Sequence, residues 1–177
     1  IGDSQASMVA NQCFKKGDTK ITLGTGACTL TNIGSDLISS KSALTALSFV
    51  YKGEPQYSFE CLTAFAGATI SWIENNLNLI NDPNDSERIS LELEDNGGVY
   101  VIPAFAGLSA PYWLPSAKAM FYGITAATNF KHIVRASLES VAYQIVAYLE
   151  YIQKNEKIDI PKIIIDGGMT NNRFLMQ

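Results

Sequence analysis

Apolar residues follow the pattern of β-strands in three parts of the chain, alternating with polar residues in two of them and forming a continuous run in the third. In KITLGTGACTLTNIG, residues 20–34, the alternation lies on both sides of Gly24-Thr25-Gly26, which predicts two strands joined by a tight turn. Residues 44–62 predict a second hairpin with its bend at residues 53–55. Three consecutive isoleucines at 163–165 predict a short buried strand.

Three other parts have apolar residues spaced three and four apart, which is the spacing of one helix face. They predict helices over residues 3–13, 66–80 and 129–154. Asn129 is the expected N-cap of the last and longest of these helices, because its side chain suits that position.

Polar and glycine-rich segments predict the connections. NDPNDSER, residues 81–88, predicts a solvated turn or linker. Asp166-Gly167-Gly168 predicts a turn that leads from the isoleucine strand into a helix opening at residues 171–177. Strands and helices mixed in this order predict an α/β fold, in which a mixed sheet is flanked by helices.

Composition narrows the classes of partner. The 177 residues are 47% hydrophobic, which is enough for a globular core, and their formal net charge is −4. A nucleic acid or an acidic membrane would need clustered Lys and Arg, so neither partner is expected. No apolar run reaches the ~20 residues of a membrane helix, and no basic leader is present. A cytoplasmic protein is therefore expected.

The chain contains three cysteines and one histidine, which give neither a disulfide framework nor the spacing of zinc ligands. No metal site is expected from them. Cys13, Cys28 and Cys61 are expected to pack as small buried hydrophobic residues. His132 is expected to cap the long helix or to lie at the surface.

Two glycine turns are the candidate binding elements. Gly24-Thr25-Gly26 lies between two strands, so it lacks the strand-to-helix setting and the third glycine of a dinucleotide fingerprint. Its backbone N–H groups and the Thr25 hydroxyl would hold a phosphate oxygen, and a plain hairpin turn is the alternative. The Gly167-Gly168 turn would let a flat ligand lie against the main chain, because no Cβ intervenes.

Two polar side chains are further candidates, each with an alternative that the sequence leaves open. Asp3 follows Gly2 where a strand would precede a helix, and its carboxylate would suit a general base in phosphoryl transfer. A helix cap is the alternative for Asp3. Asn172 would bond a ribose or a base, or else act as an N-cap.

Several segments together resemble the FGGY carbohydrate kinase family, most closely its glycerol kinase branch. AMFYGITAATNFKHIVRASLE, residues 119–139, is similar to the family's second signature, with Gly123-Ile124, His132-Ile133 and Ala136-Ser137-Leu138-Glu139 at matching spacing. GVYVIPAFAGLSAPYW resembles the stretch before that signature, and DGGMTNNRFLMQ resembles the adenosine-binding turn. The resemblance covers essentially the whole chain.

The resemblance implies an actin-like ATPase fold of the ribonuclease H type, whose two lobes close on a nucleotide. Residues 1–177 would be a partial C-terminal domain, with the first lobe and the end of the second lobe elsewhere. The implied reaction is ATP-dependent phosphorylation of a polyol, with glycerol to glycerol 3-phosphate as the first expectation. Mg²⁺ would be held mainly by the other lobe, so this chain alone is expected to be inactive. The complete protein is a candidate homo-oligomer.

Residue by residue, the resemblance assigns Asp3 as the catalytic base and, together with Ser4, as a contact to the acceptor substrate. It assigns contacts with the nucleotide to seven residues from three segments: Gly24, Thr25, Gly26, Gly67, Ser71, Gly168 and Asn172.

Two positions depart from the pattern of glycerol kinases. Ser4 stands where they usually carry a Gln that helps to bind the polyol, and Ser71 stands where they tend to carry a Gln near the ribose. A lost amide would cost ~1–3 kcal/mol if its buried partner went unpaired. A kinase for a pentulose or another polyol therefore stays open, as does a non-catalytic actin-fold regulatory module. The retained Asp3 and the two glycine turns favour an enzyme.

Overall fold

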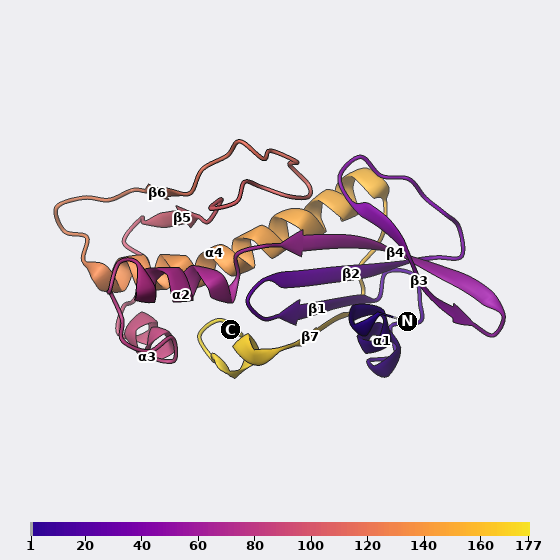
Figure 1. Cartoon of the computed structure of the whole chain (residues 1–177), viewed down its shortest axis with the longest axis horizontal. Coiled ribbons are helices and arrows are strands. Elements are labelled where there is room, and N and C mark those ends of the chain that lie inside the picture. Colours follow the sequence, from indigo (N-terminus) through magenta and orange to yellow (C-terminus); the bar gives the residue numbers. More distant parts are fainter. Residues whose placement is uncertain (1) are drawn as a thin grey trace.

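A computed structural model describes residues 2–177 as a twisted sheet with helices on both faces (Figure 1). The sheet has five strands in the order β3-β4-β2-β1-β7, and a separate two-stranded ribbon pairs β5 with β6. The strands are β1 (Thr19–Leu23), β2 (Ala27–Gly34), β3 (Leu44–Tyr51), β4 (Glu54–Thr63), β5 (Tyr100–Ile102), β6 (Met120–Tyr122) and β7 (Ile163–Asp166). The α-helices are α1 (Asp3–Ala10), α2 (Gly67–Asn75), α3 (Asp85–Leu91) and α4 (Phe130–Tyr151).

The sheet is mixed because β7 pairs in parallel with β1, whereas β1, β2, β4 and β3 pair antiparallel to one another. The predicted hairpins over residues 20–34 and 44–62 are confirmed. The second hairpin turns at Lys52 and Gly53, so Glu54 and Pro55 belong to β4 and not to the bend.

Alternate side chains of the sheet enter two different cores. On one face, Ile21, Leu23 and Phe59 pack with residues of α4 such as Val141 and Tyr148. On the other face, Met8 of α1 packs with Leu30 and Phe49. Successive side chains of a strand point to opposite faces of the sheet. Both faces therefore carry apolar residues, and helices cover both.

Helix α4 begins where the sequence predicts. The side chain of Asn129 accepts a hydrogen bond from the N–H of Lys131 at 3.0 Å, and Nδ1 of His132 accepts one from the N–H of Asn129 at 3.2 Å. The expectation that His132 is a capping residue is confirmed. Within residues 2–177, no helix has the length and apolar character that crossing a membrane requires.

Four sequence predictions need correction. Residues 81–88 contain the start of α3, because Asp82 accepts bonds from the N–H and the side-chain amide of Asn84, both at 2.8 Å, and so turns the chain into the helix. The isoleucine strand β7 is not buried, since it is an edge strand within the described residues and Ile163 is 46% exposed. Residues 171–177 form no α-helix: a 3-10 turn, η2 (Gly168–Asn171), is followed by turns. Cys28 is only half-buried, unlike the other two cysteines.

Candidate functional site

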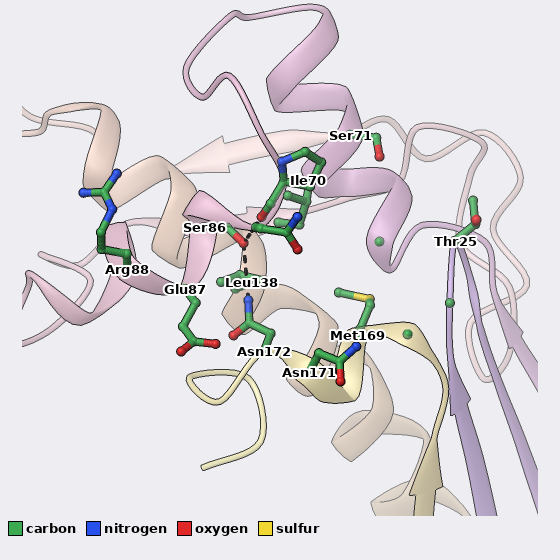
Figure 2. A pocket seen from close by; sticks show the side chains of 15 residues that line it. Thr25, Ile70, Ser71, Ser86, Glu87, Arg88, Leu138, Met169, Asn171 and Asn172 are labelled. Atoms are coloured by element: carbon green, nitrogen blue, oxygen red, sulfur yellow. Dashed lines mark hydrogen bonds between the residues drawn. The ribbon is translucent and has the colours of Figure 1, made fainter.

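A cavity of about 610 Å³ opens where the β1–β2 turn, the start of α2, the start of α3 and the η2 turn meet (Figure 2). These segments lie far apart in the sequence and converge at one end of the sheet (Figure 1). Six of the seven residues predicted to contact a nucleotide line this cavity: Gly24, Thr25, Gly67, Ser71, Gly168 and Asn172. The seventh, Gly26, belongs to the same turn as Thr25 but is not part of the lining.

The β1–β2 turn has two backbone N–H groups without an acceptor among residues 2–177, and one of them belongs to Thr25, which lines the cavity. The N–H of Gly24 closes the turn by donating to the carbonyl of Gly26 at 2.9 Å. The N–H groups of Thr25 and Gly26 donate to no acceptor among residues 2–177, and the Thr25 side chain is exposed. Adjacent free backbone donors of this kind suit an anionic oxygen.

The start of α2 is tied to the β1–β2 turn. The N–H of Gly67 donates to the carbonyl of Gly24 at 3.0 Å, and those of Ala66 and Ala68 donate to the carbonyl of Thr25 at 3.1 and 2.8 Å. These donors are therefore used by the protein and are not free for a ligand. A Cβ at Gly67 would lie 2.7 Å from the Gly24 carbonyl oxygen, so glycine is needed for this close approach.

The two glycines after β7 have different roles. Gly167 has φ +101°, and a Cβ there would lie 2.2 Å from the carbonyl oxygen of Leu23, so its glycine serves the fold. A Cβ at Gly168 would meet no heavy atom within 4 Å, and Gly168 lines the cavity. The space above Gly168 is thus open to a ligand.

The wall opposite the glycine turns comes from α3, and the sequence analysis missed it. Asn172 donates from Nδ2 to Oγ of Ser86 at 3.3 Å, while its Oδ1 accepts from the N–H of Leu175 at 3.0 Å (Figure 2). The side chain of Asn172 therefore closes the turn that follows it and also braces the η2 segment against α3. The N–H of Arg173 donates to Glu87 Oε2 at 2.7 Å and adds a second link to the same helix.

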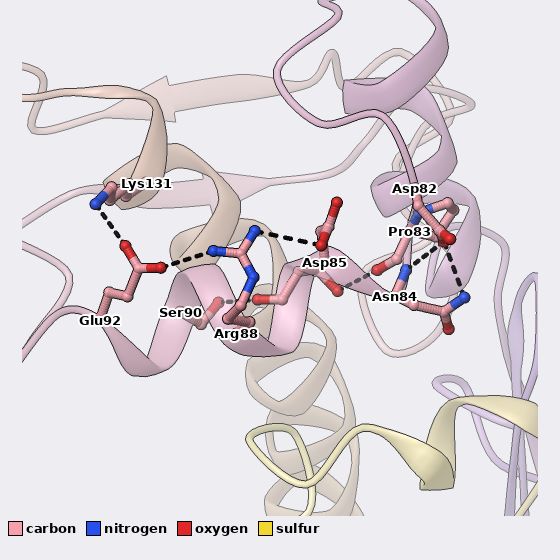
Figure 3. A network of polar contacts seen from close by, with 9 residues as sticks. Asp82, Pro83, Asn84, Asp85, Arg88, Ser90, Glu92 and Lys131 are labelled. Atoms are coloured by element: carbon pink, nitrogen blue, oxygen red, sulfur yellow. Dashed lines mark hydrogen bonds and ion pairs between the residues drawn. The ribbon is translucent and has the colours of Figure 1, made fainter.

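A network of charged side chains keeps α3 in place on its outer side (Figure 3). Arg88 pairs with Glu92 at 2.8 Å and with Asp85 at 3.3 Å. Lys131 at the start of α4 pairs with the other carboxylate oxygen of Glu92, and its hydrogen bond and charge lower the pKa of the Glu92 carboxyl. Periodicity did not reveal α3, but the run Asp82-Pro83-Asn84 before SERISL carried an initiation signal that could have identified it.

The two residues predicted to act on the acceptor lie on α1, outside the lining of the cavity. Asp3 is exposed at the first turn of the helix, where its Oδ1 accepts from the N–H of Ser4 at 2.7 Å. Ser4 lies beside Cys28: burial raises the pKa of the Cys28 thiol, and a hydrogen bond with Ser4 partly offsets that effect. Within residues 2–177, His, Cys, Asp and Glu side chains form no group of three or more that could hold a metal ion.

The sequence model of the FGGY family of carbohydrate kinases, C-terminal domain, matches residues 19–177. The chain belongs to the FGGY family. Its relatives include the glycerol kinases of Clostridium perfringens (strain SM101 / Type A), 46% identical, and Haemophilus influenzae (strain ATCC 51907 / DSM 11121 / KW20 / Rd), 43% identical. Each match covers 99% of this chain and 35% of the relative, so the FGGY chain spans about a third of the length of these curated relatives.

Solved structures agree with this assignment. The glycerol kinase of Plasmodium falciparum with ADP superposes with a TM-score of 0.92 and 35% identity, over 100% of this chain and 36% of that chain. The xylulose kinase of Rhodospirillum rubrum superposes with a TM-score of 0.83 and 20% identity, over 99% and 35%. The FGGY chain therefore has the actin-like ATPase fold, and the sequence prediction of fold and family is confirmed.

Proposed function

We propose that the protein containing this chain is an ATP-dependent kinase that phosphorylates a polyol, with glycerol to glycerol 3-phosphate as the first candidate reaction. The observation that carries this proposal is the convergence of the β1–β2 turn, the start of α2 and the η2 turn on one cavity. The glycerol kinase relatives, which are about three times as long, support the choice of acceptor. In this proposal residues 1–177 are part of the C-terminal domain, and the remaining parts of both lobes lie outside them.

The proposed position of the nucleotide follows from the chemistry of the walls. Phosphate oxygens would accept bonds from the N–H groups of Thr25 and Gly26, which have no acceptor among residues 2–177. The adenosine would lie over Gly168, where no Cβ is in the way, between η2 and α3. Ser71 and Asn172 would then flank the ribose and the base.

In the proposed reaction, the Asp3 carboxylate takes the proton from a primary hydroxyl of the acceptor. The hydroxyl oxygen forms a bond to the γ-phosphorus while the bond from that phosphorus to the β–γ bridging oxygen breaks, and ADP leaves. No residue of this chain is assigned to Mg²⁺, and we propose that the ion and most contacts to the acceptor come from other parts of the protein. The isolated chain should therefore bind nucleotide without turning over.

A second candidate acceptor is a pentulose or another polyol. The observation that favours it is the neighbourhood of Ser4, which lies beside Cys28, whose thiol is 3.8 Å from Oε1 of Glu60. A short hydroxyl and a thiol offer fewer hydrogen bonds than the amide that glycerol kinases usually carry at this position. Specificity for glycerol would then be reduced.

The proposal is tested by incubating the full-length protein with ATP and a panel of polyols and sugars while following ADP formation. ADP formation that depends on glycerol is the expected result, and a preference for a pentulose would select the second candidate. Ser4→Gln should improve glycerol turnover if glycerol is a poor substrate because of Ser4. The absence of turnover with every acceptor, in protein shown to be folded, would refute the kinase assignment.

A further inference from the structure

We propose that Lys20, Asp166 and Ser7 form a positioning cluster that fixes the helix carrying Asp3 relative to the two nucleotide turns. This inference rests on the proposed kinase function. The cluster lies between α1 and the face of the sheet that α1 covers, and its residues do not line the nucleotide cavity.

Lys20 is unusual for a charged residue, because it lies in the middle of β1 and is only 1% exposed. Its Nζ lies 2.8 Å from Oδ1 of Asp166 and also donates to Oγ1 of Thr22. A buried ammonium group is costly unless it is paired and hydrogen-bonded. The place of the Lys20 side chain between the sheet and α1 therefore depends on its pairing with Asp166.

The carboxylate of Asp166 has a second partner on a different element. Its Oδ2 accepts a hydrogen bond from Oγ of Ser7 in α1 at 3.1 Å. Partial burial raises the pKa of the Asp166 carboxyl, but the hydrogen bonds from Lys20 and Ser7 outweigh this effect and hold the pKa below its ordinary value. One oxygen thus faces the sheet and the other faces the helix, so the carboxylate joins the two.

The cluster and its partner Thr22 are close in the sequence to each part of the proposed site. Asp166 is followed directly by Gly167 and Gly168, and Thr22, its partner in the parallel register, comes two residues before Gly24. Ser7 lies four residues after Asp3, one helical turn further along α1.

The contacts of Lys20 with Asp166 and Thr22, and that of Ser7 with Asp166, hold α1 against the sheet. Without them, a small rotation of α1 would move Asp3 away from the end of a bound triphosphate. Misplacement of a reacting group by about 1 Å can cost as much as ~100-fold in rate. The cluster therefore acts through Asp3 and the turns, and it does not touch the nucleotide.

Ser7→Ala is the decisive variant, because it removes the link between α1 and Asp166 and leaves the pairing of Lys20 with Asp166 in place. The other bond that it removes, from Nδ2 of Asn11 at 3.3 Å, lies at the end of α1 itself. Alanine is a better helix former than serine, so α1 should persist. In the full-length protein we expect kcat to fall ~10-fold while the KM for ATP changes less than about twofold, since the nucleotide turns are untouched. Ser7→Thr keeps the hydroxyl and should restore much of kcat.

Asp166→Asn should behave differently, because it weakens both the contact with Lys20 and the contact with Ser7. We expect kcat to fall and the KM for ATP to rise, each ~10-fold or more. Ser40→Ala is the matched control: like Ser7→Ala it removes a serine hydroxyl that donates to a carboxylate, here Oε1 of Glu156 at 2.6 Å, but Ser40 lies in the β2–β3 loop, away from α1 and from both turns. Its kcat and KM should match the wild type.

Equal kcat values for Ser7→Ala, Ser40→Ala and the wild type would overturn the positioning role, whatever their melting temperatures. A lower melting temperature with unchanged kcat and KM would assign the cluster to stability alone and would also overturn it. A folded wild-type protein that turns over no acceptor would instead refute the proposed function, and the inference would fall with it. The two failures are therefore distinguishable.

Discussion

Replacing Gly168 with alanine separates binding from folding more cleanly than any other change at the cavity. Gly168 begins η2 and lines the cavity, and a Cβ built there meets no heavy atom within 4 Å. Its φ lies outside the left-handed region that favours glycine. The protein itself therefore gives no reason for glycine at this position, and the proposed adenosine gives one.

The two expected effects have opposite signs. Alanine restricts the unfolded chain, so Gly168→Ala should leave the free energy of unfolding unchanged or raise it by about 0.4–1 kcal/mol. In the complex the added methyl group would occupy space proposed for the nucleoside. Overpacking of this kind costs about 1–3 kcal/mol, which corresponds to a roughly 5- to 150-fold increase in the Kd for ADP.

The assay is isothermal titration of ADP into the full-length protein, combined with thermal melting of each variant without nucleotide. Gly53→Ala is the control with the reverse pattern: it also has open space, but φ is +85° at the β3–β4 turn, so it should lower the melting temperature and leave the Kd unchanged. An unchanged Kd for Gly168→Ala, with wild-type stability, would refute the placement of adenosine over this glycine.

Three other predictions test other parts of the molecule. Asp3→Asn in the full-length protein should lower kcat by about 10²–10⁴-fold with little change in the KM for ATP, and steady-state kinetics with a wild-type kcat would exclude the base role. Asn129→Ala should lower the free energy of unfolding by ~1 kcal/mol, because α4 loses its N-cap; a denaturation midpoint equal to that of the wild type would contradict this. Burial raises the pKa of the Cys61 thiol to about 12, so at pH 8 it should stay protonated and resist alkylation in the native state, whereas mass spectrometry showing rapid labelling would contradict its burial.

The sequence predicted the glycine half of the candidate site. Gly24 and Gly168 belong to glycine turns that stand out in the sequence, Gly67 was assigned through the resemblance to the family, and all three line the cavity. The half contributed by α3 was missed. Ser86 and Glu87 of α3 line the cavity. Their contacts with Asn172 and Arg173 join segments that are 86 residues apart in the sequence.

Local chemistry in the sequence by itself determined the five strands of the main sheet, the long helix with its Asn129 cap, and the positions of the glycine turns, because periodicity and turn residues act over a few positions. The tertiary structure alone decided that β7 pairs in parallel with β1, that α3 forms one wall of the cavity, and that Asp166 joins Lys20 to Ser7. Each of these depends on which distant segments meet. The pairing of β7 with β1, two strands about 140 residues apart, sets that arrangement, and no local pattern encodes such a distance.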